Sequence, residues 1–248
     1  MRTFALFILF AAAPAWGQSG MEVYESAERP LALALVGDRY HSPTYIRDGL
    51  IQALVRENVP VVFLTDHTKL TRETLAKYDL LIFLKDGMVW PNGYERGSQV
   101  LWMTDEQQQA VHDFVQDGKA FLALHNSHGI YPKGGPYYEL FWGDYGGHPP
   151  PAEFTVRVED DDHPITRGVE DYLVFDEQHM SKYDGDREHL LLRNIAKDNK
   201  SAPAGWWREY GEGRFSYLAP GHTPEALEHP MTQRLIRNAV RWLLRLDD

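Results

Sequence analysis

Residues 119–128 read Lys-Ala-Phe-Leu-Ala-Leu-His-Asn-Ser-His, in which an apolar run, Ala120–Leu124, breaks directly into four polar residues. A short, wholly apolar run is typical of a strand that is buried on both faces of a parallel sheet. A helical stretch, Thr104–Asp117, precedes it. It begins with Thr104-Asp105-Glu106-Gln107, which fits a capping box, and it ends at Gly118. Ligands of open α/β folds bind beyond the carboxyl ends of such strands. The pattern therefore predicts an α/β fold with His125 at a candidate site.

A second strand end carries the same signal. Phe215–Leu218 is followed by Ala-Pro-Gly-His-Thr, which places His222 beyond a strand. Further strands are predicted at Leu31–Val36, Val59–Thr65 and Leu80–Leu84, with helical spacing between them. The stretch Lys85–Met103 is predicted to be a loop. Such β-α alternation predicts a parallel sheet with right-handed crossovers.

The second half of the chain has a different pattern. Gly129–Ala152 is rich in Gly, Pro and aromatic residues without a period, and a loop of that length is usually functional. Short strands are predicted around Phe154–Val158, Leu173–Phe175 and Leu190–Ile195. A hairpin joins Ala204–Tyr210 to Arg214–Leu218 through Gly211-Glu212-Gly213, and a last helix runs from about Thr232 to Leu246.

Composition restricts the location and the partners. Residues 1–17 resemble a secretory signal with an apolar core, Phe4–Ala13, and a small-x-small cleavage site, so we expect a secreted or periplasmic protein. Residues 18–29 are predicted to be a flexible lead-in. The chain has no cysteine, which excludes a thiol nucleophile and a lipoprotein anchor. A net charge of -11 argues against nucleic acid and anionic membranes as partners.

Polar residues gather after the predicted strands. They are His125, Asn126, Ser127 and His128, then His148, then Asp176, Glu177, Gln178 and His179, then Arg208, and finally His222. Three chemistries fit these residue types. The first is general acid–base catalysis by histidine and a carboxylate. The second is a metal site assembled from distant loops, and the third is a serine triad through Ser127, although the Gly-x-Ser-x-Gly signature is missing.

At these residues the sequence resembles the ThuA-like (trehalose-utilisation) family. The motifs that carry the resemblance are Phe121-Leu122-Ala123-Leu124-His125, Gly147-His148-Pro149-Pro150, Asp162-His163-Pro164, Asp176-Glu177, Trp207-Arg208-Glu209-Tyr210-Gly211 and Gly221-His222. The resemblance implies a flavodoxin-like three-layer sandwich of the class I glutamine amidotransferase type, over residues 30–248. His125 stands where true amidotransferases carry their cysteine, so amidotransfer through a thiolate is excluded.

The resemblance also implies a carbohydrate-active enzyme. We expect isomerisation or elimination of a keto-sugar or glycoside, with His125, Glu177, Arg208 and His222 as catalytic residues. Expected substrate-binding residues are His148, Asn126, Trp142 and His179; His179 follows Gln178 where the family commonly has Leu-Tyr. A divalent metal such as zinc could be held by His125, His148 and His222.

Two alternatives stay open. One is a metal-dependent glycoside or ester hydrolase, and the other is a non-catalytic carbohydrate-binding or scaffold protein. In each case the expected partner is a small-molecule sugar or glycoside, and the sequence does not fix whether the protein forms a homo-oligomer.

Overall fold

The computed structural model describes residues 29–95 and 97–247. The predicted signal segment, and nearly all of the predicted lead-in, lie outside the described residues. Within the described part of the chain, no helix has the length and apolar character needed to cross a membrane.

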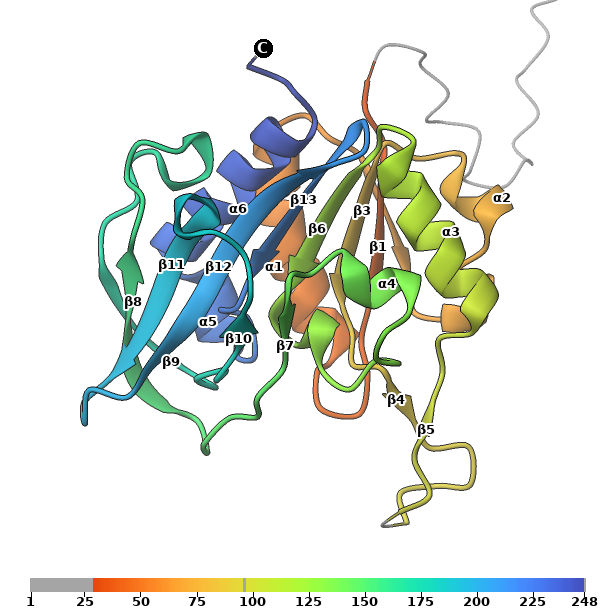
Figure 1. Ribbon diagram of the computed structural model, residues 1–248, viewed down its shortest axis with the longest axis horizontal. Coiled ribbons are helices and arrows are strands. Elements are labelled where there is room, and N and C mark those ends of the chain that lie inside the picture. The colour runs from red at the N-terminus through yellow and green to blue at the C-terminus, as the bar shows by residue number, and fades with distance from the viewer. Residues whose placement is uncertain (1–28, 96, 248) are drawn as a thin grey trace, which may run out of the picture.

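A nine-stranded sheet forms the centre of the molecule, in the order β2-β1-β3-β6-β13-β12-β11-β8-β9 (Figure 1). Its strands are β1 (Ala32–Val36), β2 (Val61–Leu64), β3 (Leu80–Leu84), β6 (Ala120–Leu124), β8 (Ala152–Val158), β9 (Tyr172–Asp176), β11 (Leu190–Ala196), β12 (Ser201–Tyr210) and β13 (Gly213–Leu218). The five strands from β2 to β13 are parallel to one another, and every later pair is antiparallel.

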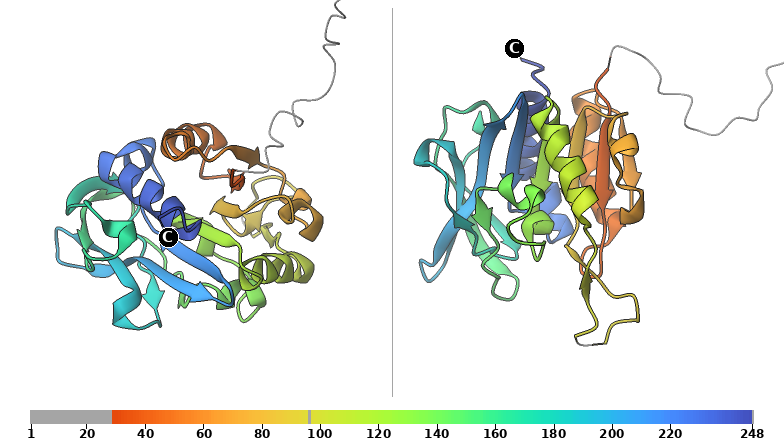
Figure 2. Two further views of the ribbon diagram at one scale, coloured as in Figure 1. Left: turned by 90° about the horizontal axis from the view of Figure 1, so that it is seen from above. Right: turned by 45° about the vertical axis from the view of Figure 1, so that its right-hand side comes forward.

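Helices cover both faces of this sheet, which confirms the predicted α/β sandwich with its mainly parallel central sheet (Figures 1 and 2). The helices are α1 (Pro43–Arg56), α2 (Arg72–Leu75), α3 (Asp105–Gln116), α4 (Pro136–Glu139), α5 (Pro224–Glu228) and α6 (Pro230–Leu243). Helices α1, α5 and α6 share one face, whereas α3 and α4 lie on the other. Thr104 and Gln107 form the capping box that begins α3.

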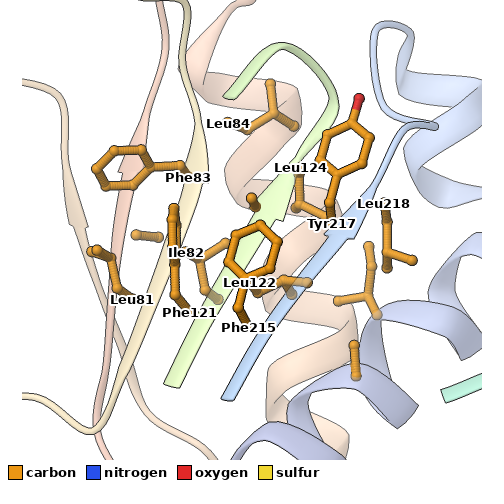
Figure 3. Packing of buried hydrophobic residues seen from close by; sticks show 14 of the residues in the cluster. Leu81, Ile82, Phe83, Leu84, Phe121, Leu122, Leu124, Phe215, Tyr217 and Leu218 are labelled. Atoms are coloured by element: carbon orange, nitrogen blue, oxygen red, sulfur yellow. The ribbon is translucent and has the colours of Figure 1, made fainter. Parts of the chain in front are cut away.

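The central parallel strands are buried on both faces, as their apolar sequences require, whereas the edge strand β2 is only partly buried. All five residues of β1, β3 and β6 are buried. Aromatic side chains of neighbouring strands interlock in this core: Phe121 lies 5.2 Å from Phe83 and 5.4 Å from Phe215 between ring centroids, both near edge-to-face (Figure 3). Such contacts add to the free energy gained from apolar burial.

Two predicted loops contain regular structure. Within the stretch 85–103, β4 (Met88–Val89) pairs with β5 (Val100–Leu101) to form a two-stranded arm that projects from the body (Figure 2). Within the stretch 129–152, α4 is followed by β7 (Gly143–Asp144), which pairs with β10 (Lys182–Tyr183). Pairs of two residues leave too little periodicity to be seen in sequence.

The antiparallel half of the sheet curls around α5 and α6. Neighbouring strands lie about 4.8 Å apart, so the five steps from β6 to β9 would span roughly 24 Å in a flat sheet. Yet the Asp176 carboxylate at the end of β9 accepts a hydrogen bond from the Gly221 amide at 2.8 Å. A Cβ on Gly221 would lie only 3.4 Å from the His125 Cβ at the end of β6. The curl therefore brings the last strand back to the ends of the first ones.

Candidate active site

Four strand ends converge on one group of side chains. His41 follows β1, His125 follows β6, His222 follows β13, and Glu177 follows β9. Each offers a nitrogen or carboxylate oxygen, and these atoms all lie within 4.8 Å of one another. We call these four residues the histidine–glutamate cluster.

Glu177 is the centre of a wider ring of histidines. Its Oε2 atom lies 3.2 Å from His222 Nδ1, 3.5 Å from His125 Nε2, 3.4 Å from His148 Nε2 and 3.8 Å from His179 Nε2. The structure thus brings together five residues that the sequence singled out, and it adds His41.

Backbone geometry places His125 at a tight strand-to-turn junction. The residue has φ of 48°, in the left-handed region that non-glycine residues seldom occupy, and it begins the 3₁₀ turn His125–His128. Tyr217 donates a hydrogen bond of 2.8 Å to the His125 carbonyl, which helps to hold the junction. Strain of this kind gathers at functional sites, where surrounding contacts maintain it.

Hydrogen-bond partners determine which ring nitrogen of His125 and His41 carries the hydrogen. His125 Nδ1 lies 2.9 Å from the Ala219 carbonyl, which only accepts, so Nδ1–H donates and Nε2 keeps a lone pair. His41 Nδ1 lies 2.8 Å from Asp38 Oδ1, so its Nε2 likewise presents a lone pair, 2.9 Å from His222 Nδ1. Carboxylate or carbonyl partners of this kind usually orient the histidines that bind metals.

The cluster consequently holds acceptors that face one another. His125 Nε2 is buried and has no hydrogen-bond partner in the described part of the chain, and it points at the Glu177 carboxylate, which is also an acceptor. Two facing acceptors are stable only with a positive charge between them, either a proton or a metal ion. Three imidazoles and one carboxylate form a donor set that suits zinc and similar divalent metals.

Burial disfavours a proton, compared with a metal ion, as the positive charge between His125 and Glu177. Desolvation lowers the pKa of His125, and it lowers the pKa of His179, which stacks on His125 with ring centroids 4.0 Å apart. Both rings are therefore held neutral, the form that binds metals. Burial alone would raise the pKa of Glu177, but its contacts with the surrounding histidines outweigh burial and hold the pKa well below its usual value.

The pKa of His222 is shifted in the opposite direction from those of His125 and His179. Burial disfavours its charged form, but the interaction with Glu177 and the nearby carboxylates of Asp176 and Asp38 outweigh burial and raise its pKa. Asp176 itself faces the backbone rather than the cluster. Its carboxylate accepts hydrogen bonds from the amides of Gly221, His222 and Thr223, at 2.8, 3.0 and 3.2 Å.

Asn126 and His148 occupy the margins of the site. The Asn126 side-chain amide donates to Asp38 Oδ2 at 3.1 Å, so it braces the carboxylate that orients His41. His148 is the more open residue, with 32% of its side chain exposed. Its Nδ1 lies 2.9 Å from the Pro149 carbonyl, which leaves the Nε2 lone pair facing Glu177.

Two residues predicted for the site lie elsewhere. The Arg208 guanidinium donates to the Glu139 carbonyl at 2.8 Å, at the end of α4, and stacks on Trp142 at 3.8 Å from the ring centroid. Arg208 pairs with Phe215 near the start of β13, whereas the cluster lies beyond that strand's carboxyl end. The sequence predicts Arg208 as a catalytic residue, but in the structure its guanidinium holds the loop that follows α4. Trp142, predicted to bind substrate, packs against Arg208 in that loop.

The serine triad is also not formed. The Ser127 hydroxyl is buried and has no hydrogen-bond partner among the described residues, histidines included. His128, its neighbour, contacts the Ser181 hydroxyl at 3.2 Å and packs on Tyr217, away from Ser127.

His41 and Asp38 are not among the residues predicted for the site from the sequence. Both lie in the loop after β1, so the rule that pointed to His125 and His222 also applied to them. Of the residues predicted to bind metal, the cluster contains His125 and His222. His41 and Glu177 complete it, and His148 lies beside it.

Comparisons with known proteins agree with this architecture. A putative ThuA-like protein from Parabacteroides merdae has 15% identity and a TM-score of 0.67, over 88% of this chain and 90% of that one. A putative ThuA-like protein from Bacteroides uniformis has 16% identity and a TM-score of 0.63, over 88% and 93%.

A β-galactosidase from Bacillus circulans sp. alkalophilus has 14% identity and a TM-score of 0.53, over 83% of this chain but 30% of that enzyme. No curated protein matches the sequence. The family model described as ThuA, trehalose utilisation, matches residues 33–243. This chain therefore belongs to the ThuA family.

Proposed function

We propose that this protein is a divalent-metal-dependent enzyme that acts on a keto-sugar or glycoside. The observation that carries the proposal is the buried acceptor His125 Nε2, which faces the partly buried carboxylate oxygen Glu177 Oε2 at 3.5 Å. The sugar substrate is inferred from the family description, trehalose utilisation.

His41, His125, His222 and Glu177 would hold the metal. A divalent cation bound there supplies a Lewis acid for a sugar carbonyl or hydroxyl oxygen. The protein contributes orientation, because Asp38 and the Ala219 carbonyl fix the ring planes of His41 and His125.

His148 is the residue best placed to move protons. It faces the cluster but lies outside the ligand group, and its partial exposure lets a substrate reach Nε2. Imidazole at such a position can remove the acidic hydrogen beside a ketone and return it to a neighbouring carbon or to a leaving group. Glu177 is a poorer base than the sequence suggested, because its pKa is held low.

The test combines metal content with substrate exchange. After chelator treatment the protein is titrated with zinc or manganese, and 3-keto-trehalose in deuterated buffer is followed by NMR. We expect one metal per chain, and deuterium beside the ketone or a shifted carbonyl only in the loaded protein. His41→Ala and His125→Ala should lose the metal, whereas His112→Ala, a histidine on α3, should keep it.

Other outcomes decide between the alternatives. Release of free sugar without deuterium exchange would indicate direct hydrolysis. Metal-independent exchange, or an unchanged spectrum in the metal-loaded protein, would contradict the proposal; saturable sugar binding without product would then favour the binding-protein alternative.

A further inference from the structure

Beside the cluster, aromatic residues gather on two loops at the same edge of the sheet. Tyr40, in the loop after β1, packs edge-on against Trp90 with ring centroids 5.7 Å apart, and Trp90 packs against Tyr94 at 6.0 Å. Trp90 and Tyr94 lie between β4 and β5, on the arm that projects in Figure 1. Tyr40 is 52% exposed and Tyr94 is 66% exposed, so the group is open to solvent.

A cation lies over these rings. The Arg39 guanidinium carbon is 4.3 Å from the Tyr94 ring centroid and 5.0 Å from that of Trp90. Among residues 29–95 and 97–247, no carboxylate forms an ion pair with Arg39. Stacking orients a guanidinium while leaving its N–H groups free to donate.

This group is continuous with the histidine–glutamate cluster. Tyr40 precedes His41 in the chain, and their ring centroids are 6.4 Å apart. A molecule bound at the cluster therefore needs to extend by about one ring to reach Tyr40 and Trp90.

We propose that Tyr40, Trp90, Tyr94 and Arg39 form the binding site for the second sugar ring of a disaccharide or larger glycoside. The inference rests on the proposed function, since the first ring would lie at the cluster. Aromatic faces match the apolar C–H faces of a pyranose, and guanidinium donors match its hydroxyls. A purely apolar partner would not use the free donors of Arg39.

The test measures binding of trehalose and of glucose by saturation-transfer NMR, with metal-loaded wild type and with Trp90→Ala and Tyr40→Ala. We expect wild type to bind trehalose more tightly than glucose. Each variant should weaken trehalose binding by about 3- to 10-fold and leave glucose binding nearly unchanged. Trp90→Phe should restore most of the difference. Val100→Ala, at an exposed position of the same arm, should have no effect.

Several results would overturn the inference. One is equal affinity of wild type for the two sugars, and another is equal weakening of both sugars by Trp90→Ala. A third is a change from dimer to monomer in sedimentation velocity on Trp90→Ala, with sugar binding intact, because the arm would then be an interface between copies. Metal content of the same samples separates failure of this inference from failure of the proposed metal site.

Discussion

The parallel and antiparallel halves of the sheet contribute to the cluster in different ways. In the parallel half, the carboxyl ends of β1, β6 and β13 lie side by side and place His41, His125 and His222 directly at the cluster. In the antiparallel half, Glu177 follows β9 at the far edge of the sheet and reaches the cluster through the curl. The first contribution follows from local chain direction, whereas the second depends on how four antiparallel strands bend.

Asp176 joins the two halves. Its carboxylate accepts from three consecutive amides after β13, and it lies one residue before Glu177. Alternate residues of β9 face the helices, so Tyr172 contacts Thr232 of α6 on the side where Asp176 is also buried. The site thus lies at the junction of the two halves of the sheet rather than in a pocket within either half. We call this junction, held by Asp176, the seam.

The largest effect, a loss of turnover, is expected when Glu177, the residue that the antiparallel half contributes to the cluster, is replaced. Glu177→Gln should lower turnover by about 10² or more, because a neutral amide cannot balance a divalent cation. The melting temperature should stay near that of wild type. Steady-state kinetics and metal analysis check this, with the exposed Glu170→Gln as the matched control. Wild-type turnover in Glu177→Gln would remove this residue from the mechanism.

A second variant weakens the seam itself. Asp176→Asn places an amide NH₂ group opposite backbone donors and should cost about 3 kcal/mol of unfolding free energy. Metal affinity should fall by about 10- to 100-fold, since the loop that carries His222 loses its support. Urea unfolding and metal titration measure both effects.

Asp171→Asn is the control for that variant, because Asp171 lies just before β9 and accepts one amide at 2.8 Å. It should cost about 1 kcal/mol or less and leave metal affinity unchanged. Unchanged metal affinity in Asp176→Asn would show that the halves hold the cluster independently.

The third prediction concerns pH and the parallel half alone. Burial raises the pKa of Asp86, just after β3, from its ordinary value of 3.8 to about 7. Between these values the folded state binds more protons than the unfolded state, so stability falls as pH rises. From pH 5 to pH 8 the titration of Asp86 should lower the free energy of unfolding by about 2 to 3 kcal/mol.

Asp86→Asn should abolish this loss of unfolding free energy between pH 5 and pH 8. Urea unfolding of variant and wild type at the two pH values measures it. The amide oxygen can still accept from the Met88 amide, which Asp86 Oδ1 now accepts at 2.8 Å. An identical pH dependence in variant and wild type would refute the buried titration of Asp86.

The smallest effect is expected in the antiparallel half away from the seam. Arg208→Met should cost about 1 to 2 kcal/mol of stability through the lost contacts with Trp142 and the Glu139 carbonyl. Turnover and metal content should stay within about twofold of wild type. A loss of turnover near 10² at unchanged stability would instead return Arg208 to the catalytic site.

Sequence alone determined the features that depend on short-range pattern. Wholly apolar runs identified the buried strands, Thr104 and Gln107 identified the start of α3, and the breaks after Leu124 and Leu218 located His125 and His222. Burial and chain direction are encoded residue by residue, so these predictions needed no knowledge of partners. The same rule would have found His41 had it been applied to the loop after β1.

Only the tertiary structure decided which polar residues meet. Glu177 and Arg208 both belong to the antiparallel half, since Glu177 directly follows β9 and Arg208 lies within β12. The curl brings Glu177 to within 3.2 Å of His222 but leaves Arg208 beside Trp142. The arm strands β4 and β5 likewise exist through pairing of two-residue segments. The curl arises from twist and packing summed over many strands, so no local stretch of sequence records it.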